Sequence, residues 1–459
     1  TAIHAFRVGR FLGRHFARGK CPRIVLGKDT RLSSYAFEYA LAAGAAASGA
    51  DVYLLHVTTT PSVSYVVRSE GFDCGVMISA SHNPFSDNGL KLFGGDGEKM
   101  PEGTLALVEE YLDGGTLPLA TGADIGRTID YVAGRNRYLA YLLSLPRTSF
   151  RGLRVGLDCA NGSAWALAKT VFDALGAQVW CIGTTPDGTN INAECGSTHP
   201  ERLCELVRMH SLDVGFAFDG DADRCICVDE KGQIVDGDGI LYVCAKDMAE
   251  RGELGGGGIV TTVVSNGGLA RALERMGVLC ARTQVGDKYV YEEMTKRESL
   301  LGGEPSGHIV FRKYASTGDG ILTALKVAEL ILERKSPLSF LTQGYRPLPQ
   351  KMLNVPVKGG AEIVAQESVR AAIVRAEKSG VRMVVRPSGT EPLVRILAEG
   401  DESAAEDAAR LVERAVLSCA EALLCAALSA ASEENMLRPF SLTGFRSWNT
   451  EGMILRESL

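Results

Sequence analysis

The residues at 78–93, ISASHNPFSDNGLKLF, bring a serine, Ser81, next to a histidine, His82. This pair is compatible with a serine hydrolase, but neighbouring residues of an extended segment point in opposite directions. The chain also lacks a G-x-S-x-G sequence, which positions the nucleophile in many such hydrolases. A turn built on Asn83-Pro84 and on DNG at 87–89 is a simpler alternative. Ser81 is therefore a candidate nucleophile whose chemistry depends on what other loops supply.

A second loop, DGDADR at 219–224, lies between the apolar runs VGFAF and CICVD. Its aspartates alternate, and alternate residues of an extended chain face the same side. Clustered carboxylates without histidine or cysteine favour a hard cation such as Mg²⁺, Mn²⁺ or Ca²⁺. A solvated acidic turn is the plainer alternative. An EF-hand would place Glu230 at its twelfth position, but Arg224 stands where that loop needs glycine and a β-rich run follows instead of a helix. The predicted cation ligands are Asp219, Asp221 and Asp223.

Two further loops have compositions that suit a phosphorylated ligand. RPSGTEP at 386–392 offers hydroxyls, backbone N–H groups freed by glycine and a forked guanidinium, which together can surround an anion. GGEPSGH at 302–308 offers a carboxylate and a hydroxyl that could hold sugar hydroxyl groups. Each loop taken alone is more typical of an ordinary turn. Their occurrence with a serine and a triple-aspartate loop favours phosphoryl transfer.

The elements that must position these loops form three similar units, each with a strand, a helix ending near glycine, and a second strand. The units start near Ile24, Val155 and Ile259. This alternation predicts mainly parallel sheets covered by helices. We therefore expect an α/β fold with three tandem α/β domains, at 1–150, 151–250 and 251–345.

A proline-bearing connector after Lys335 indicates a further boundary, because proline is poorly tolerated in helices and central strands. Strand-like runs and a long helical run then predict a smaller α+β domain at 350–428. Residues 429–459 show no sustained period, and we assign this tail no role.

Composition limits the partners of the chain. The net charge is −6 and the pI is about 5.8, which argues against nucleic acid because such binding needs many contacts from Lys and Arg. No stretch predicts a signal peptide or a membrane span. The 12 cysteines include no C-x-x-C pair, so neither a disulfide framework nor a zinc site is indicated. We expect a cytoplasmic protein with reduced thiols.

In order along the chain, SASHNP with DNGLK, DGDADR, GEPSGH and RPSGTEP resemble the four active-site loops of the α-D-phosphohexomutase superfamily. The resemblance runs from about residue 5 to about residue 420. Within the superfamily, ISASHNPFSDNG and SGTEP most resemble the bacterial phosphoglucosamine mutases, and the phosphomannomutase/phosphoglucomutase branch is the alternative. The resemblance implies four domains around a central cleft, of which the first three are α/β and the last is smaller.

The resemblance also implies a site and a reaction. Ser81 would carry a phosphoryl group, and the three aspartates would hold Mg²⁺ together with a phosphoserine oxygen. The reaction would interconvert glucosamine 6-phosphate and glucosamine 1-phosphate, with glucosamine 1,6-bisphosphate as intermediate or primer, on the route to UDP-N-acetylglucosamine and cell-wall precursors. The ligand would be this phosphosugar, and glucosamine-type relatives imply a homodimer. The residues implied around the transferring group are Lys91, which could serve in proton transfer, Arg224 and His308. Those implied to bind sugar hydroxyls are Glu304 and Ser306. Those implied to bind the non-reacting phosphate are Arg386, Ser388, Gly389 and Thr390, with Arg395 adding charge.

The sequence departs from the family at its beginning. Family members usually open with a segment like FGTDGxRG, whose strand completes the first domain and whose arginine lies near the active site. This sequence starts at a point that resembles the following helix, and true absence of that segment would put first-domain stability and activity in question. A non-catalytic sugar-phosphate or metal binder of the same fold is a hypothesis of another class. Ser81 and the complete aspartate triplet argue against it, because a binder needs no nucleophile.

Overall fold

The computed structural model describes residues 1–17, 19–388 and 391–436. Gly389, Thr390 and the end of the expected tail, 437–459, lie outside the described residues. Residues 1–265 and 269–345 form one compact unit, and residues 266–268 group with the described part from 346 onward in a second unit. The backbone of Gly267 donates to Glu399 Oε2 at 2.8 Å, which ties residues 266–268 to the second unit.

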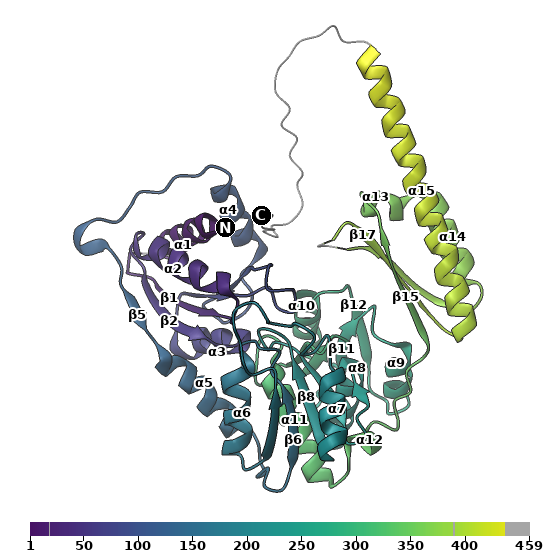
Figure 1. Ribbon diagram of the computed structural model, residues 1–459, viewed down its shortest axis with the longest axis horizontal. Coiled ribbons are helices and arrows are strands. Elements are labelled where there is room, and N and C mark those ends of the chain that lie inside the picture. The colour runs from purple at the N-terminus through teal and green to yellow at the C-terminus, as the bar shows by residue number, and fades with distance from the viewer. Residues whose placement is uncertain (18, 389–390, 437–459) are drawn as a thin grey trace. The chain divides into compact units, whose positions relative to one another are not determined.

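The first sheet has the strand order β4-β3-β1-β2-β5 and contains the loop of Ser81. Its strands β1, β2 and β5 are labelled in Figure 1. Strand β3 is buried along its whole length, as expected for a central strand covered on both faces. Only the β3–β4 pair is antiparallel in this sheet; the other pairs are parallel. Its strands are β1 Arg23–Lys28, β2 Asp51–Val57, β3 Cys74–Ile78, β4 Leu90–Gly94 and β5 Thr128–Asp130. Its helices are α1 Ala2–His15, α2 Leu32–Ala46, α3 Thr60–Glu70, α4 Glu102–Leu112 and α5 Val132–Ser144, with a short 3₁₀ turn at Gly122–Asp124.

The second sheet has the order β10-β9-β8-β6-β7 and contains the aspartate loop. Strand β8 is fully buried, and β9 follows the loop, which confirms that a strand and not an EF-hand helix comes next. The strands are β6 Arg154–Asp158, β7 Gln178–Ile182, β8 Val214–Phe218, β9 Cys225–Asp229 and β10 Ile234–Val235. The helices are α6 Ala164–Ala174, α7 Glu201–His210 and α8 Gly237–Glu250.

The third sheet has the order β12-β11-β13-β14. Some of its buried apolar side chains, such as Ile259 and Leu301, share one core cluster with side chains of the second sheet such as Phe216. The strands are β11 Ile259–Thr262, β12 Cys280–Thr283, β13 Leu301–Gly303 and β14 Ile309–Phe311. The helices are α9 Gly267–Glu274, α10 Asp287–Arg297, α11 Gly320–Arg334 and α12 Leu338–Leu341.

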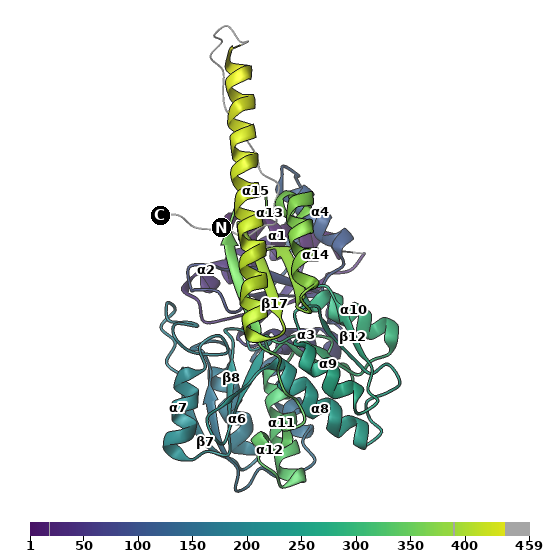
Figure 2. The same cartoon turned by 90° about the vertical axis from the view of Figure 1, so that its right-hand side faces the viewer.

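The second unit contains a smaller antiparallel sheet of order β15-β17-β16. Helices α14 and α15 lie side by side along this sheet (Figure 2). The strands are β15 Gln350–Pro356, β16 Arg382–Pro387 and β17 Leu393–Glu399. The helices are α13 Gly360–Ala365, α14 Glu367–Glu377 and α15 Glu402–Met436.

Helix α15 continues to Met436, past residue 428, where we expected the last domain to end. The sequence AALSAASEE carries the helix onward, since alanine and glutamate are strong helix formers. In the described ranges, no helix has both the length and the apolar character that a membrane crossing requires.

All four motif loops share one structural setting, in which each joins two antiparallel strands. These pairs are β3–β4, β8–β9, β13–β14 and β16–β17. In the three α/β sheets, the first strand of each pair also runs parallel to a central neighbour, β1, β6 or β11. The first three loops therefore leave from the carboxyl ends of parallel strands, the edge at which ligands bind in open α/β sheets.

Candidate active site

The loop between β3 and β4 holds Ser81 in an unusual backbone conformation. Its φ is +52°, in the left-handed region that residues other than glycine rarely adopt. Its backbone N–H donates to Ser79 Oγ at 2.9 Å, and its side chain donates to Asp219 Oδ2 at 2.5 Å. Ser81 is 9% exposed. The loop thus aims the hydroxyl of Ser81 at the aspartate loop of the second sheet.

The left-handed backbone also corrects one step of the sequence argument. Because Ser81 is not extended, His82 does not point away from it, and His82 Nδ1 lies 3.4 Å from Ser81 Oγ. Burial, followed by the charge of Arg224, lowers the pKa of His82 to about 4. A histidine with so low a pKa is a weak base, which does not suit activation of a serine hydroxyl.

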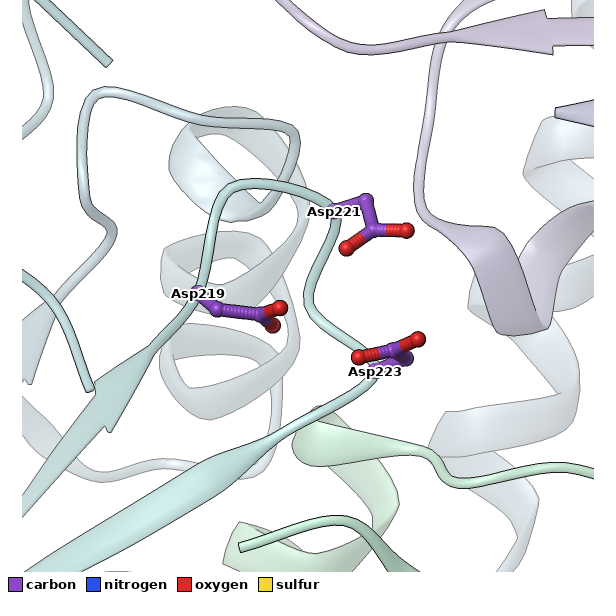
Figure 3. Close-up of side chains that lie close together, drawn as sticks. All are labelled: Asp219, Asp221 and Asp223. Atoms are coloured by element: carbon purple, nitrogen blue, oxygen red, sulfur yellow. The ribbon is translucent and has the colours of Figure 1, made fainter. Parts of the chain in front are cut away.

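The three aspartates of the second loop form a buried group of carboxylates. One oxygen from each of Asp219, Asp221 and Asp223 lies within 4.8 Å of the others, and Figure 3 shows all three gathered on the loop between β8 and β9. Asp221 Oδ1 is buried without a hydrogen-bond partner among the described residues. A set of carboxylate oxygens with an unsatisfied member fits a hard divalent cation, which prefers oxygen ligands. These residues could therefore hold a metal ion.

Thr60, at the start of α3, links the aspartate loop to the first sheet. Its backbone N–H donates to the carbonyl of Asp221 at 3.0 Å, and its hydroxyl donates to Asp221 Oδ2. Nothing in the sequence around Thr60 indicated this contact, because TTTPS reads as an ordinary helix start.

Lys91 places a positive charge against the same carboxylates. Its position on β4, opposite Met77 of β3, brings Nζ to 2.6 Å from Asp221 Oδ2 and 2.8 Å from Asp223 Oδ2. Burial lowers the pKa of Lys91, but the three carboxylates outweigh burial and raise it. Burial raises the pKa of Asp219 well above its usual value, and the charges of Asp223 and Asp221 add to this effect. One ammonium group therefore faces three carboxylates. The three carboxylates together attract further positive charge.

His308 and Arg224 lie at the other side of Asp223. His308 Nε2 accepts the backbone N–H of Gly318 at 3.0 Å, so the neutral ring carries its proton on Nδ1, which lies 3.7 Å from Asp223 Oδ1. Arg224 Nε lies 3.9 Å from the same oxygen. The pKa of Asp223 is lowered because Lys91, His308 and Arg224 outweigh the effect of burial.

Glu304 and Ser306 lie on the loop between β13 and β14, in the same unit. Glu304 Oε1 accepts the backbone N–H of Gly286 at 3.0 Å, and Ser306 Oγ lies 3.5 Å from Glu304 Oε2. Both belong to the loop that ends at His308. The structure therefore brings the predicted residues of the first three motif loops into one unit.

The predicted phosphate residues lie in the second unit, and Arg386 and Arg395 face each other across β16 and β17 as directly opposite residues. Like charges directly opposite in an antiparallel pair are destabilising, so a bound anion would relieve this repulsion. Arg395 also pairs with Glu391 at 2.8 Å. Ser388 donates its backbone N–H to Leu393 O at 2.9 Å, which closes the loop. Gly389 and Thr390, predicted for the same loop, lie outside the described residues.

Sequence reasoning missed Arg31, Asn192 and Asp287. Arg31 is fully buried beside Asp29, and a charged run directly after a buried strand was the only indication of it. Asp287 Oδ2 lies 3.6 Å from His308 Nε2, and Lys99 pairs with it. Asn192 contacts the Ser81 loop from a segment that carries no recognisable motif.

Comparison with known proteins identifies relatives over most of the chain. Four models of the phosphoglucomutase/phosphomannomutase family match: α/β/α domain I at 1–117, domain II at 136–232, domain III at 236–347 and the C-terminal domain at 352–416. The chain is 55% identical over 425 residues to a phosphoglucosamine mutase of Lachnospira eligens, covering 91% of this chain and 94% of that protein. It is 45% identical over 401 residues to the phosphoglucosamine mutase of Bacillus subtilis, covering 86% and 90%.

Solved structures show the same fold. A phosphoglucomutase/phosphomannomutase family protein from Burkholderia thailandensis superposes with a TM-score of 0.78 at 25% identity, covering 91% of this chain and 94% of that chain. An N-acetylphosphoglucosamine mutase of Aspergillus fumigatus, solved with GlcNAc-6P and magnesium, has a TM-score of 0.63 at 19% identity, covering 88% and 78%.

Proposed function

The chain belongs to the phosphoglucomutase/phosphomannomutase family of phosphohexomutases, and we propose that it interconverts glucosamine 6-phosphate and glucosamine 1-phosphate through a phosphorylated Ser81. The observation that carries this proposal is the hydrogen bond from Ser81 Oγ to Asp219, which joins a nucleophile to a buried group of carboxylates. A binding protein would need no such hydroxyl. The glucosamine substrate rests on the relatives named phosphoglucosamine mutase at 45–55% identity.

The reaction transfers one phosphoryl group in each direction. Phospho-Ser81 would give its phosphoryl group to the free hydroxyl at C1 or C6 of the sugar phosphate. The P–O bond to Ser81 Oγ would break, and Ser81 Oγ would take up a proton as the sugar hydroxyl loses one. The resulting glucosamine 1,6-bisphosphate would turn round, and its other phosphoryl group would return to Ser81. Phosphoryl transfer asks the protein mainly to align the attacking and leaving oxygens and to offset their charge. The left-handed turn at Ser81 serves this alignment by fixing the direction of Oγ.

Asp219, Asp221 and Asp223 would hold Mg²⁺, which would supply charge neutralisation for the phosphoryl group when bound. Lys91, Arg224 and His308 surround the same place and contribute positive charge and hydrogen-bond donors. We assign this proton exchange to Lys91: its ammonium form would give a proton to the leaving oxygen, and the resulting amine would take the proton of the attacking hydroxyl. Glu304 and Ser306 would orient the sugar hydroxyls.

The phosphate that does not react needs a binding site of its own. Arg386, Ser388 and Arg395 would bind it, with Gly389 and Thr390 of the same motif. Two opposite arginines favour an anion, and a guanidinium fork matches phosphate oxygens. Both the 6-phosphate and the 1-phosphate would use this site in turn, since the sugar reverses between the two transfers.

Two predictions about the setting of the enzyme accompany this function. A homodimer is expected, and light scattering of the purified chain would test it. The cytoplasm is the expected location, because the product leads to UDP-N-acetylglucosamine and cell-wall precursors.

The proposal is tested by measuring turnover of glucosamine 6-phosphate, glucose 6-phosphate and mannose 6-phosphate to their 1-phosphates, with Mg²⁺ and a hexose 1,6-bisphosphate as primer. The highest kcat/KM is expected on glucosamine 6-phosphate. Preference for glucose or mannose would assign the chain to the phosphomannomutase/phosphoglucomutase branch. A folded chain that binds these sugars and Mg²⁺ without turnover would be a binder and would overturn the proposal.

A further inference from the structure

Two buried side chains hold both carbonyls that flank His82 in the Ser81 loop. Arg31 Nη2 donates to Ser81 O at 3.1 Å and to Asn83 O at 2.7 Å. Asn192 Nδ2 donates to the same two oxygens, at 2.9 Å and 3.0 Å. An amide nitrogen has two hydrogens, so Asn192 uses both of them on this loop. Each carbonyl thus accepts one bond from Arg31 and one from Asn192.

Asn192 comes from a different sheet than the loop it holds. It lies between β7 and α7 of the second sheet, and its backbone N–H donates to Ala160 O at 2.8 Å. Its φ is +59°, a left-handed conformation that asparagine tolerates better than most residues. Asn192 is also 9% exposed, so its amide is fixed in place by its surroundings. It therefore fixes the loop of Ser81 relative to the second sheet.

The same contact meets the aspartate loop at Gly220, between Asp219 and Asp221. A Cβ added at Gly220 would stand 2.6 Å from Ser81 O and 3.0 Å from Asn192 Nδ2. Only glycine allows this approach. The carbonyl of Ser81, the amide of Asn192 and the backbone of the aspartate loop are therefore packed into one junction.

We propose that Asn192 is a positioning residue for Ser81. A left-handed backbone at a serine persists only when surrounding contacts impose it, and the bonds from Asn192 and Arg31 impose it here. With its carbonyl fixed, Ser81 keeps Oγ on Asp219, one of the proposed metal ligands. Asn192 touches neither sugar nor metal in this account and acts through the loop backbone. The inference rests on the proposed function, because positioning matters only if Ser81 transfers a phosphoryl group.

The test compares Asn192→Ala and Asn192→Asp with Asn190→Ala. Asn190 lies two residues away and also makes two side-chain bonds, to Thr185 O at 2.9 Å and from the N–H of Asp187 at 3.1 Å. Neither bond reaches the Ser81 loop, so Asn190→Ala repeats the same chemical change without the proposed effect. Asn192→Asp keeps the side-chain volume but replaces the donor with an acceptor. It therefore separates loss of the hydrogen bonds from the effect of a cavity.

Loss of two hydrogen bonds of ordinary strength is expected to lower kcat about 30-fold in Asn192→Ala. For Asn192→Ala, the KM for glucosamine 6-phosphate and the unfolding temperature should match those of Asn190→Ala. A residue with a purely structural role would instead lower the unfolding temperature without a selective loss of kcat. Equal kcat in all three variants would overturn the proposal.

An inactive wild type would contradict the proposed function but would not test the role of Asn192. Crystal structures of the wild type and of Asn192→Ala test that role independently of activity. Ser81 is expected to leave the left-handed region and to withdraw Oγ from Asp219 in the variant. An unchanged Ser81 backbone would overturn the positioning role whatever the activity.

Discussion

The hydroxyl of Ser81 donates a hydrogen bond to the carboxylate of Asp219, although 138 positions separate the two residues in the chain. Each lies on a loop that leaves the carboxyl end of a buried strand, β3 or β8. The fold thereby places a nucleophile beside a group of carboxylates that could hold a metal ion.

Replacement of Ser81 by alanine is expected to abolish mutase turnover, by about 10⁴-fold or more, because the phosphoryl carrier is lost. The measurement is kcat on glucosamine 6-phosphate, together with phosphate incorporation from a bisphosphate. Ser86→Ala is the matched control, since Ser86 is an exposed serine of the same loop. Equal losses in both variants, or turnover in Ser81→Ala, would remove Ser81 from the mechanism.

Magnesium is expected to raise the unfolding temperature of the wild type and not that of Asp221→Asn. A ligand that binds only the folded state stabilises it by about 2.7 kcal/mol at 100 times its Kd. Asp229→Asn serves as the control, because Asp229 accepts backbone N–H groups of Lys231 and Gln233 and lies outside the carboxylate group. That variant should unfold at a lower temperature yet keep the magnesium response. A magnesium shift retained in Asp221→Asn would place the ion elsewhere.

Arg386→Ala is expected to raise the KM for glucosamine 6-phosphate about 10- to 100-fold, the scale of a lost charge-assisted hydrogen bond to phosphate. Arg386→Lys should restore little of this loss, since an ammonium group lacks the guanidinium fork. Arg410→Ala on α15, whose partners are Glu406 and Glu413, is the control and should leave KM unchanged. A KM for Arg386→Ala equal to that of the control would exclude Arg386 from phosphate binding.

Asp319 is expected to contribute a loss of stability as the pH rises through the range from about 4 to 6. Burial raises the pKa of Asp319 to about 6, and its carboxylate caps α11 and accepts the Tyr138 hydroxyl at 2.7 Å. The ordinary carboxyl pKa is about 3.9, so in this range the folded state binds more protons than the unfolded state. The resulting penalty is roughly 2 to 3 kcal/mol and is complete above pH 6.

Asp319→Asn removes the titrating group but keeps a residue that can cap a helix. The difference in unfolding temperature, variant minus wild type, should therefore grow as the pH rises from 4 to 7. A difference that stays constant with pH would show that Asp319 has an ordinary pKa.

The chemistry of the site could be predicted from the sequence because each loop carries its groups within a few consecutive residues. The motif DGDADR contains all three aspartates of the site, and the apolar run before it indicates the strand. The three strand-helix-strand units are found as β1-α2-β2, β6-α6-β7 and β11-α9-β12. Element ends are less predictable: α2 begins at Leu32, and its N-cap residue, Arg31, makes no side-chain capping bond that would mark this start.

Contacts from segments that carry no motif could not be predicted. Asn192 reaches the Ser81 loop across 111 positions, and its own segment shows no pattern that would indicate a partner. The left-handed backbone of Ser81 was hidden for the same reason, because serine has no preference for that conformation and the surrounding bonds impose it. Such features are set by packing between sheets and not by local sequence.

The most direct measurement starts from enzyme labelled with ³²P on Ser81 and follows the label after addition of unlabelled glucosamine 6-phosphate and Mg²⁺. The account predicts that label leaves the protein and appears in the sugar bisphosphate and then in glucosamine 1-phosphate, at the rate of turnover. Label that stays on Ser81 while glucosamine 1-phosphate accumulates would contradict transfer through this serine.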